Sequence, residues 1–397
     1  MRTQLLSSLV VLGLVAGGCA SSTTDGEEGA APLTEDATSC NNGALPAADR
    51  TRKVVVSHPF GTDPAVYEVL NLSASGTLTK TGKKFSMGQA NSFAPIVFTP
   101  SGKIGLATQQ DGTIGVFRFE TNGSVTVVNK AWSGGFYANA ITMDPSGTKA
   151  YAVDSDTVEN GGGVWQIAIG CDGTLTTTAR TVTGGGATAM SLVPTNKKNA
   201  VLYANSAGAS EPTSNAFLVD VGVTPATVKV GGDAFGDQVA HSSAIGVTLD
   251  GKYALIGDDG ITAGDRLSVV DTTYMKHRQL FTTRAPFAIV MSPWGNAAIV
   301  VNGDDADEIS TLRYNPANED APFTQTGDIA YTLPRPSLPG AAVQIERGTL
   351  KGRVLVAELL AVRQVKFTSA GDVKDVSQLK WPDTDNGQII GTVGIQP

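Results

Sequence analysis

The sequence predicts an all-β fold, a seven-bladed β-propeller, and two observations support this. First, a phrase recurs in which an apolar strand, a Pro- or Asp-Gly turn and a second apolar strand follow one another, with turns at residues 100, 145, 194, 250 and 293. The spacings of 43 to 56 residues are typical of propeller blades with four strands each. Second, short runs of β-branched and aromatic residues alternate with Gly, Asn, Asp and Pro, without a long helical pattern.

Residues 1–18 are predicted to form a signal peptide. Arg2 precedes an apolar stretch at 5–15 that is too short to span a bilayer, and small residues at 16–18 lead to Cys19. This ending resembles the bacterial lipobox, in which cleavage leaves the cysteine as a lipid-modified N-terminus, although Ala16 stands where that pattern prefers Leu. We therefore expect a lipid on Cys19. The alternative is an ordinary signal peptide that is cut nearby.

Residues 19–50 are predicted to form a flexible tether, and residues 51–397 the propeller. The tether is rich in Ser, Thr, Ala, Gly and acids, so it buries too little apolar surface to order itself. The net charge of −8 argues against nucleic acid and anionic lipid as partners. No later apolar run reaches spanning length, so we expect membrane contact through the lipid alone, at the outer membrane or periplasmic side of a bacterial cell envelope.

Two cysteines remain once Cys19 is assigned to the lipid. Cys40 and Cys171 would reach an oxidising compartment after export, where a disulfide can persist. We predict that they pair. Two unpaired thiols are the alternative, because spacing alone does not determine connectivity.

The repeat divides the rest of the chain into blades. Blades two to seven are predicted at 92–132, 139–182, 188–230, 243–283, 288–330 and 340–379. Blade one has strands at 52–57, 65–72 and 76–86 but lacks a first strand, and residues 388–397 resemble a lone first strand. Pairing that strand into blade one would close the ring and remove exposed edges. The alternative is six blades with a stray terminal strand.

The repeat also resembles a known family. The phrase DPSGTKAYAV at 144–153, followed by VWQI at 164–167 and DGTL at 172–175, is similar to repeats of the seven-bladed lactonase family. That family includes bacterial 6-phosphogluconolactonases and surface proteins with YVTN-type repeats. The resemblance covers residues 52–397 and implies the fold, but propellers host many unrelated functions.

Strand order sorts the loops between two ends of the ring. Loops between blades, and loops joining second to third strands, lie at what we call the upper end; the other turns lie at the lower end, with both ends of the propeller segment. Acidic residues gather in upper loops, among them Asp258, Asp259, Asp304 and Asp305. These carboxylates could bind Ca²⁺, although none of them completes an EF-hand pattern. We expect that the protein requires no cofactor. The alternative is that Asp serves the turns themselves.

A lactonase needs a group that activates water, a cation for the developing oxyanion, and a way to hold the acid product. The resemblance implies a His, an acid and Arg residues at the upper mouth. His241 and Arg284 fall in loops entering blades five and six, and Glu358 is a matching acid, while His58 lies farther around the ring. The alternative is that His241 and Arg284 are ordinary polar loop residues, because the local motifs of the family do not match here.

Two functions follow from these features. The first is a monomeric, non-enzymatic lipoprotein whose upper end binds an envelope protein, a glycan or a small molecule. The second is a lactone hydrolase that acts outside the cytoplasm through His241, Arg284 and Glu358. The sequence leaves enzymatic activity open.

Overall fold

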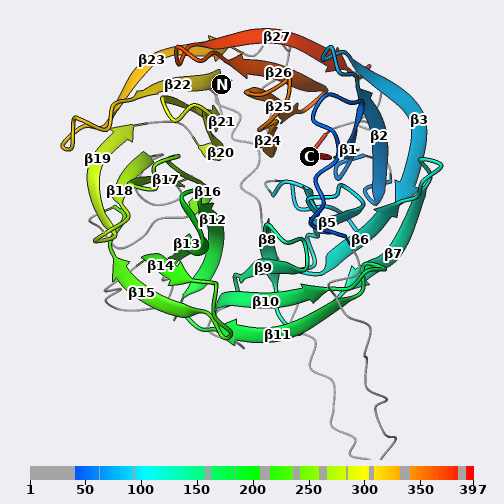
Figure 1. Ribbon diagram of the computed structural model, residues 1–397, viewed down its shortest axis with the longest axis horizontal. Coiled ribbons are helices and arrows are strands. Elements are labelled where there is room, and N and C mark those ends of the chain that lie inside the picture. The colour runs from blue at the N-terminus through cyan, green and yellow to red at the C-terminus, as the bar shows by residue number, and fades with distance from the viewer. Residues whose placement is uncertain are drawn as a thin grey trace, which may run out of the picture. The chain divides into compact units, whose positions relative to one another are not determined.

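The computed structural model describes residues 41–61, 63–92, 94–156, 162–183, 185–205, 215–235, 242–258, 266–282, 285–303, 308–330, 340–382 and 390–397. These residues form seven four-stranded antiparallel sheets. Figure 1 shows the sheets following one another around a ring, which confirms the seven-bladed propeller. Within the described part of the chain, no helix is long and apolar enough to cross a membrane.

The blades follow the chain in order. Blade one contains β28 (Val393–Ile395), β1 (Arg52–Ser57), β2 (Val66–Leu72) and β3 (Leu78–Ser86). Blade two contains β4 (Val97–Phe98), β5 (Ile104–Thr108), β6 (Ile114–Phe119) and β7 (Val125–Trp132). Blade three contains β8 (Ala138–Met143), β9 (Lys149–Asp154), β10 (Gly163–Ile169) and β11 (Leu175–Thr181). Blade four contains β12 (Gly186–Val193), β13 (Asn196–Asn205), β14 (Ala216–Asp220) and β15 (Thr227–Gly232).

The last three blades repeat this order. Blade five contains β16 (Ser242–Val247), β17 (Tyr253–Asp258), β18 (Arg266–Asp271) and β19 (Lys276–Thr282). Blade six contains β20 (Pro286–Met291), β21 (Ala297–Asn302), β22 (Glu308–Tyr314) and β23 (Phe323–Ala330). Blade seven contains β24 (Ala342–Gln344), β25 (Arg353–Glu358), β26 (Ala361–Phe367) and β27 (Val373–Lys380). Each blade agrees with its predicted segment to within a few residues.

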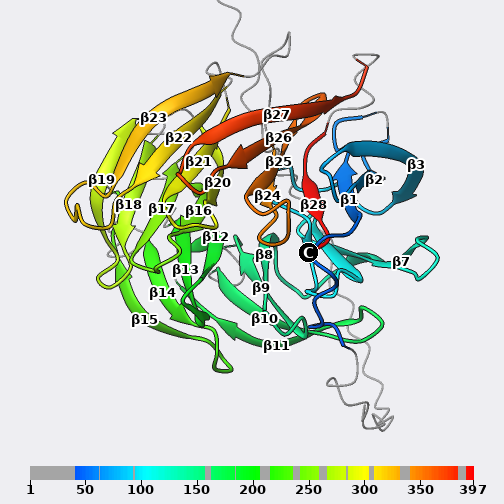
Figure 2. The same ribbon diagram turned by 45° about the horizontal axis from the view of Figure 1, so that its top comes forward.

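The C-terminal strand closes the ring. β28 pairs antiparallel with β1, with Val393 opposite Val56 and Ile395 opposite Val54, and Figure 2 shows the two strands side by side. The alternative of six blades with a stray strand is therefore wrong. The strand is shorter than the predicted 388–397. Beyond its end, Gln396 N donates to the Lys53 carbonyl at 3.0 Å and Gln396 Oε1 accepts a hydrogen bond from Lys53 N at 3.1 Å.

The core lies between blades. Seven clusters of buried apolar side chains each combine residues of two neighbouring blades. Second strands such as β5 are buried along their whole length, whereas outermost strands such as β3 are largely exposed. Gly105 in β5 has a clear packing reason, because a Cβ there would lie 2.2 Å from Cζ of the buried Phe117. No single blade could bury its own apolar faces, so the repeats stabilise one another.

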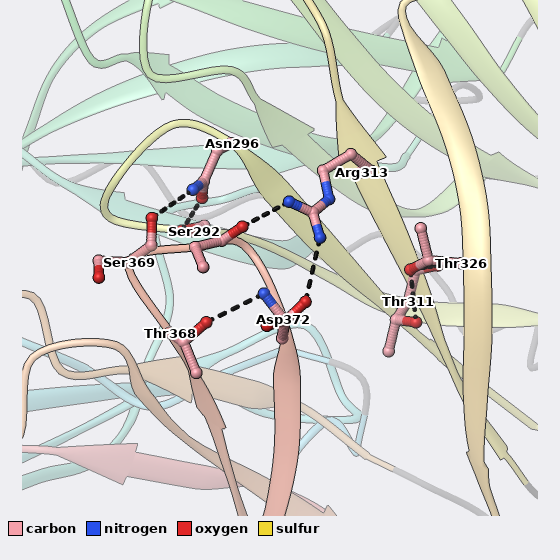
Figure 3. Close-up of polar contacts among 9 residues, drawn as sticks. Ser292, Asn296, Thr311, Arg313, Thr326, Thr368, Ser369 and Asp372 are labelled. Carbon is pink, nitrogen blue, oxygen red and sulfur yellow. Dashed lines mark hydrogen bonds and ion pairs between the residues drawn. The ribbon is translucent and has the colours of Figure 1, made fainter.

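Polar contacts join neighbouring blades at the lower end. Arg313, at the end of the third strand of blade six, reaches the turn between β26 and β27, where it pairs with Asp372 at 3.0 Å and donates to the Ala370 carbonyl (Figure 3). Asn296 donates to the Ser369 carbonyl of the same turn at 2.8 Å. Similar contacts join other neighbours. Arg353 of blade seven donates to the Gly76 carbonyl of blade one, and Lys83 of blade one donates to the Gly123 carbonyl of blade two.

Residues 41–50, which composition assigns to the tether, lie against the lower end of the ring. Asn42 is buried, and its carbonyl accepts a hydrogen bond from Ser101 N at 2.8 Å in the first turn of blade two. Asp49 accepts hydrogen bonds from the backbone and hydroxyl of Thr349 in blade seven. This segment therefore connects turns of blades on both sides of the closing strand.

Candidate functional site

At the upper end, a buried polar residue closes the second strand of five blades and contacts the neighbouring third strand. Four of these residues reach a side chain on their own face of the sheet, diagonally across the strand pair, and Asp258 reaches the residue directly opposite. The pairs are His58–Glu68, Asp154–Trp165, Asp258–Arg266, Asn302–Ser310 and Glu358–Arg363. Each of the five residues is at most 3% exposed. Because the loop to the third strand follows directly, these pairs hold the base of each upper loop.

Glu358 is the only one of the three predicted catalytic residues that falls within the described part of the chain. Its side chain is fully buried, forms an ion pair with Arg363, and accepts a hydrogen bond from Gln378 Nε2 at 3.1 Å. Arg363 also pairs with Asp375 at 2.6 Å, so one cation serves two carboxylates. Burial raises the pKa of Glu358 to about 7, Asp375 acts in the same direction, and Arg363 opposes both.

This environment makes Glu358 a poor base for a substrate. A pKa near neutrality is suited to proton transfer, but a general base must also come within hydrogen-bond distance of the proton it removes. The oxygens of Glu358 are engaged with Arg363 and Gln378, and the side chain has no exposed surface. The geometry therefore gives Glu358 a structural role at the top of blade seven.

His58 belongs to a second buried polar cluster at the upper end, between blades one and seven. Its Nε2 lies 3.3 Å from Glu68 Oε2, and Trp381 Nε1 donates to the same oxygen at 3.1 Å. Burial raises the pKa of Glu68, but the close His58 imidazole and the hydrogen bond from Trp381 outweigh it and leave the pKa below its usual value. Lys80 Nζ lies 4.2 Å from the centre of the Trp381 ring. Glu68 is thus an ionised acceptor shared by two blades.

The other predicted upper-end residues fall mostly outside the described residues. These are His241, Arg284, Asp259, Asp304 and Asp305. The convergence of His241 and Arg284 with an acid therefore stays a prediction, as does the Ca²⁺ site. Asp258 is described, and its Oδ2 accepts hydrogen bonds from Arg266 Nη2 at 2.8 Å and Nε at 3.1 Å. Within the described ranges, no three His, Cys, Asp or Glu side chains are grouped to hold a metal ion.

Of the three cysteines, only Cys171 is described. It lies in the exposed turn between β10 and β11, at the lower end as predicted from strand order. Cys19 and Cys40 fall outside the described residues, so the lipid site and the disulfide stay predictions.

A cavity of about 690 Å³ occupies the centre of the ring, lined by innermost strands. Its walls are mostly apolar along β8, β12, β16, β20 and β24, with Thr142, Ser191 and Gln344 as polar exceptions. Charged residues belong to its lower mouth, where Lys197 lies at the start of β13 and Glu346 and Lys351 lie in the turn after β24. Among the described lining residues there is no histidine.

Sequence reasoning missed two sets of residues. The pairing of residues that close second strands was missed, because Asp258 was assigned to a possible metal site and Glu358 to catalysis, although a polar residue ends the second-strand phrase at 154, 258, 302 and 358. Three arginines at the lower end, Arg50, Arg52 and Arg347, were not anticipated as a group. No local signal joins them, because Arg347 is brought beside the others only when the ring closes.

No protein-family model and no curated protein matches the sequence. Solved structures do match. A candidate 6-phosphogluconolactonase from Bacteroides fragilis is 14% identical, with a TM-score of 0.61 over 88% of this chain and 99% of that one. One from Bacteroides uniformis is 13% identical, with a TM-score of 0.64 over 87% and 99%. The periplasmic gluconolactonase of Pseudomonas aeruginosa is 13% identical, with a TM-score of 0.62 over 87% and 99%. At these identities the likeness shows the lactonase-like propeller fold.

Proposed function

We propose that the protein is a cell-envelope lipoprotein whose lactonase-like propeller binds an envelope protein, a glycan or a small molecule at its upper end. The observation that carries this proposal is the set of buried pairs that close the second strands, from Asp154–Trp165 to Glu358–Arg363. They place rigid anchors under the upper loops, and binding residues are commonly found on loops positioned by a rigid scaffold. Glu358, the acid that the sequence suggested for catalysis, is engaged in one of these pairs with Arg363.

Export and lipid attachment rest on Cys19 and the apolar stretch before it. The periplasmic location of the structurally similar Pseudomonas aeruginosa gluconolactonase supports a similar compartment for this protein. A disulfide between Cys40 and Cys171 would suit that compartment. Labelling of cells with a palmitate analogue tests the anchor: we expect label on the wild type and on Cys40→Ser, and none on Cys19→Ser. Equal labelling of Cys19→Ser would exclude the lipid site.

Ligand binding at the upper end is tested with the purified protein. For the metal version, Ca²⁺ is titrated while thermal unfolding is followed, since a ligand that binds only the folded state raises the midpoint. We expect a saturable shift that is reduced in Asp304→Asn and kept in Asp328→Asn, which lies on the outer strand β23. An unchanged midpoint in the wild type would remove Ca²⁺ from the proposal and leave glycan and protein ligands.

A lactone hydrolase is the second candidate, favoured by the likeness to three lactonase-named structures. His241 would act as the base and Arg284 would stabilise the oxyanion. A panel of sugar and aromatic lactones decides the matter. If the protein hydrolyses them, His241→Ala and Arg284→Gln should lower kcat/KM at least a hundredfold. His277→Ala, a histidine on the exposed face of β19, should not. Absence of hydrolysis across the panel would leave the binding function alone.

A further inference from the structure

At the lower end, a second cavity of about 400 Å³ opens beside the described N-terminal segment. Gly43 and Leu45 of that segment form part of its wall, together with turns after the first strands of blades two, three and seven. It shares Met143, Leu192 and Gln344 with the central cavity, so the two are continuous around the lower mouth of the channel. The volume falls in the range of sites that hold small molecules.

Three arginines meet at this cavity, and we call Arg50, Arg52 and Arg347 the arginine cluster. Arg52 and Arg347 line the wall, and the charges of both act on Arg50. Arg52 is 1% exposed, although it is the first residue of β1. The wall also contains Lys197. Four cations therefore gather at one mouth of a protein whose net charge is −8.

The hydrogen bonds of the two lining arginines go to neutral carbonyl groups. Arg52 Nη2 donates to the carbonyls of Ala48 and Arg347, and Arg347 Nη2 donates to the carbonyl of Pro46 at 2.6 Å. Arg50 donates to Oε1 of Gln396 at 3.3 Å and to O of Pro397 at 3.2 Å. Among the described residues, no Asp or Glu side chain lies within salt-bridge distance of the three arginines.

Several donors of the cluster are buried without an acceptor. These are Arg50 Nε, Arg52 Nε, Arg52 Nη1 and Arg347 Nε. A buried donor without a partner costs free energy, and such groups in native proteins usually meet a water or an ion. Burial, together with the charge of neighbouring arginines, lowers the pKa of Arg50 and of Arg52, and the charge of Asp49 opposes this only in part at Arg52.

The acids near the cluster do not neutralise it. Asp49 is directed to Thr349, whose backbone N–H it accepts at 2.6 Å. Of the two acids in the cavity wall, Asp144 holds its own turn by accepting from Ser146 N at 2.8 Å, and Glu346 is exposed. Guanidinium groups match the planar, paired oxygens of carboxylate and phosphate better than any other side chain.

We propose that the arginine cluster is a binding site for an oxyanion, the carboxylate or phosphate group of a small acidic molecule seated in the lower cavity. The anion would accept from the unpartnered N–H groups of Arg52 and Arg347, and the rest of the molecule would extend along the apolar wall at Leu45 and Leu192. The site is at the end of the ring opposite the upper loops. It therefore does not rest on the proposed function, and each can fail without the other.

Isothermal titration of the full chain tests the site, with sodium phosphate and sodium malonate as probes in buffer of constant ionic strength set with chloride. We expect saturable binding of at least one probe, and the tighter of the two identifies phosphate or carboxylate as the group preferred. Arg347→Gln should weaken this binding at least tenfold, because it removes one of the charged donors. Arg52→Gln should also weaken the binding at least tenfold. If the Arg52→Gln variant does not fold, the result for Arg347→Gln alone tests the proposal.

Arg118→Gln is the matched control, since Arg118 is a half-exposed arginine of the lower end that already pairs with Glu120 at 2.8 Å. Its affinity for the probe should equal that of the wild type. Failure of both probes to bind would overturn the proposal and assign the unpartnered donors to water. An equal loss of affinity in Arg118→Gln and Arg347→Gln would also overturn it, since the attraction would then be general rather than local.

Discussion

Removal of the closing strand is the sharpest test of the ring. Deletion of residues 393–397 takes away β28, whose Val393 side chain is fully buried between blades one and seven. Burial of such a side chain contributes about 1.5–3 kcal/mol. The deletion also removes the bond from Ile96 N to the Val393 carbonyl, the bond from Gln396 N to the Lys53 carbonyl, and the bond from Gln396 Nε2 to the carbonyl of residue 102. At about 0.5–1.5 kcal/mol each, these three hydrogen bonds bring the expected loss to about 3–7.5 kcal/mol.

That loss is a large part of the about 5–15 kcal/mol by which native proteins are stable. It also leaves β1 as an unpaired edge, which favours association. Urea unfolding followed by tryptophan fluorescence, with light scattering for the oligomeric state, measures both effects. Val393→Ala should lose part of the same stability, and Val376→Ala, on the exposed β27, should change little. A truncated chain that stays monomeric with an unchanged midpoint and slope would refute the closure.

Three further predictions concern the packing of blades. Glu358→Ala should lower the free energy of unfolding by about 1–3 kcal/mol, because Arg363 and Gln378 lose a buried acceptor while Asp375 still pairs with Arg363. The raised pKa of Glu358 means that the folded state binds the Glu358 proton more tightly than the unfolded state does. The free energy of unfolding of the wild type should therefore fall as pH rises from about 4.5 through about 7. Urea titrations at each pH should show this dependence in the wild type and its loss in Glu358→Gln. Gly105→Ala should cost about 1–3 kcal/mol in the same assay, because its Cβ overlaps the ring of Phe117. Arg313→Met should cost about 1 kcal/mol or less, and less again at high salt, since its carboxylate pair is exposed.

The fold could be predicted from the sequence because the same pattern of short apolar strands and turns recurs in each blade. The turn at Asp144–Pro145 and its counterparts mark the same point of each blade, and the strands on either side are short and apolar in every copy. Closure of the ring could be predicted by counting strands in each blade. Blade one had no first strand before Arg52, and an additional strand was predicted at residues 388–397. The lengths of the inner strands did not follow. β4 has two residues where the sequence suggested a longer strand, because apolar side chains alone do not determine how far a ladder continues.

The candidate site was harder to predict, because the same residues serve catalysis and structure. Glu358 has the type and position of an active-site acid, and only its contact with Arg363 shows that it supports a loop. The partner of each strand-closing residue lies on the next strand, so its distance along the chain depends on the loop between them. Arg363 follows Glu358 by five residues, whereas Trp165 follows Asp154 by eleven. A pairing with no constant spacing leaves no pattern in a repeat, although four of the five pairs share the same diagonal geometry.

The arginine cluster could not be predicted from the sequence either, because its members lie far apart along the chain. Arg52 and Arg347 are separated by 295 residues, and the chain must form blades two to six and the first strand of blade seven before Arg347 reaches the start of β1. Their approach depends on closure of the ring, so any oxyanion bound between them would contact both the N-terminal segment and blade seven. It would therefore stabilise the seam that β28 closes. Phosphate or malonate, if bound at this cluster, should raise the unfolding midpoint of Val393→Ala, and Arg347→Gln should cancel that gain while leaving the variant folded.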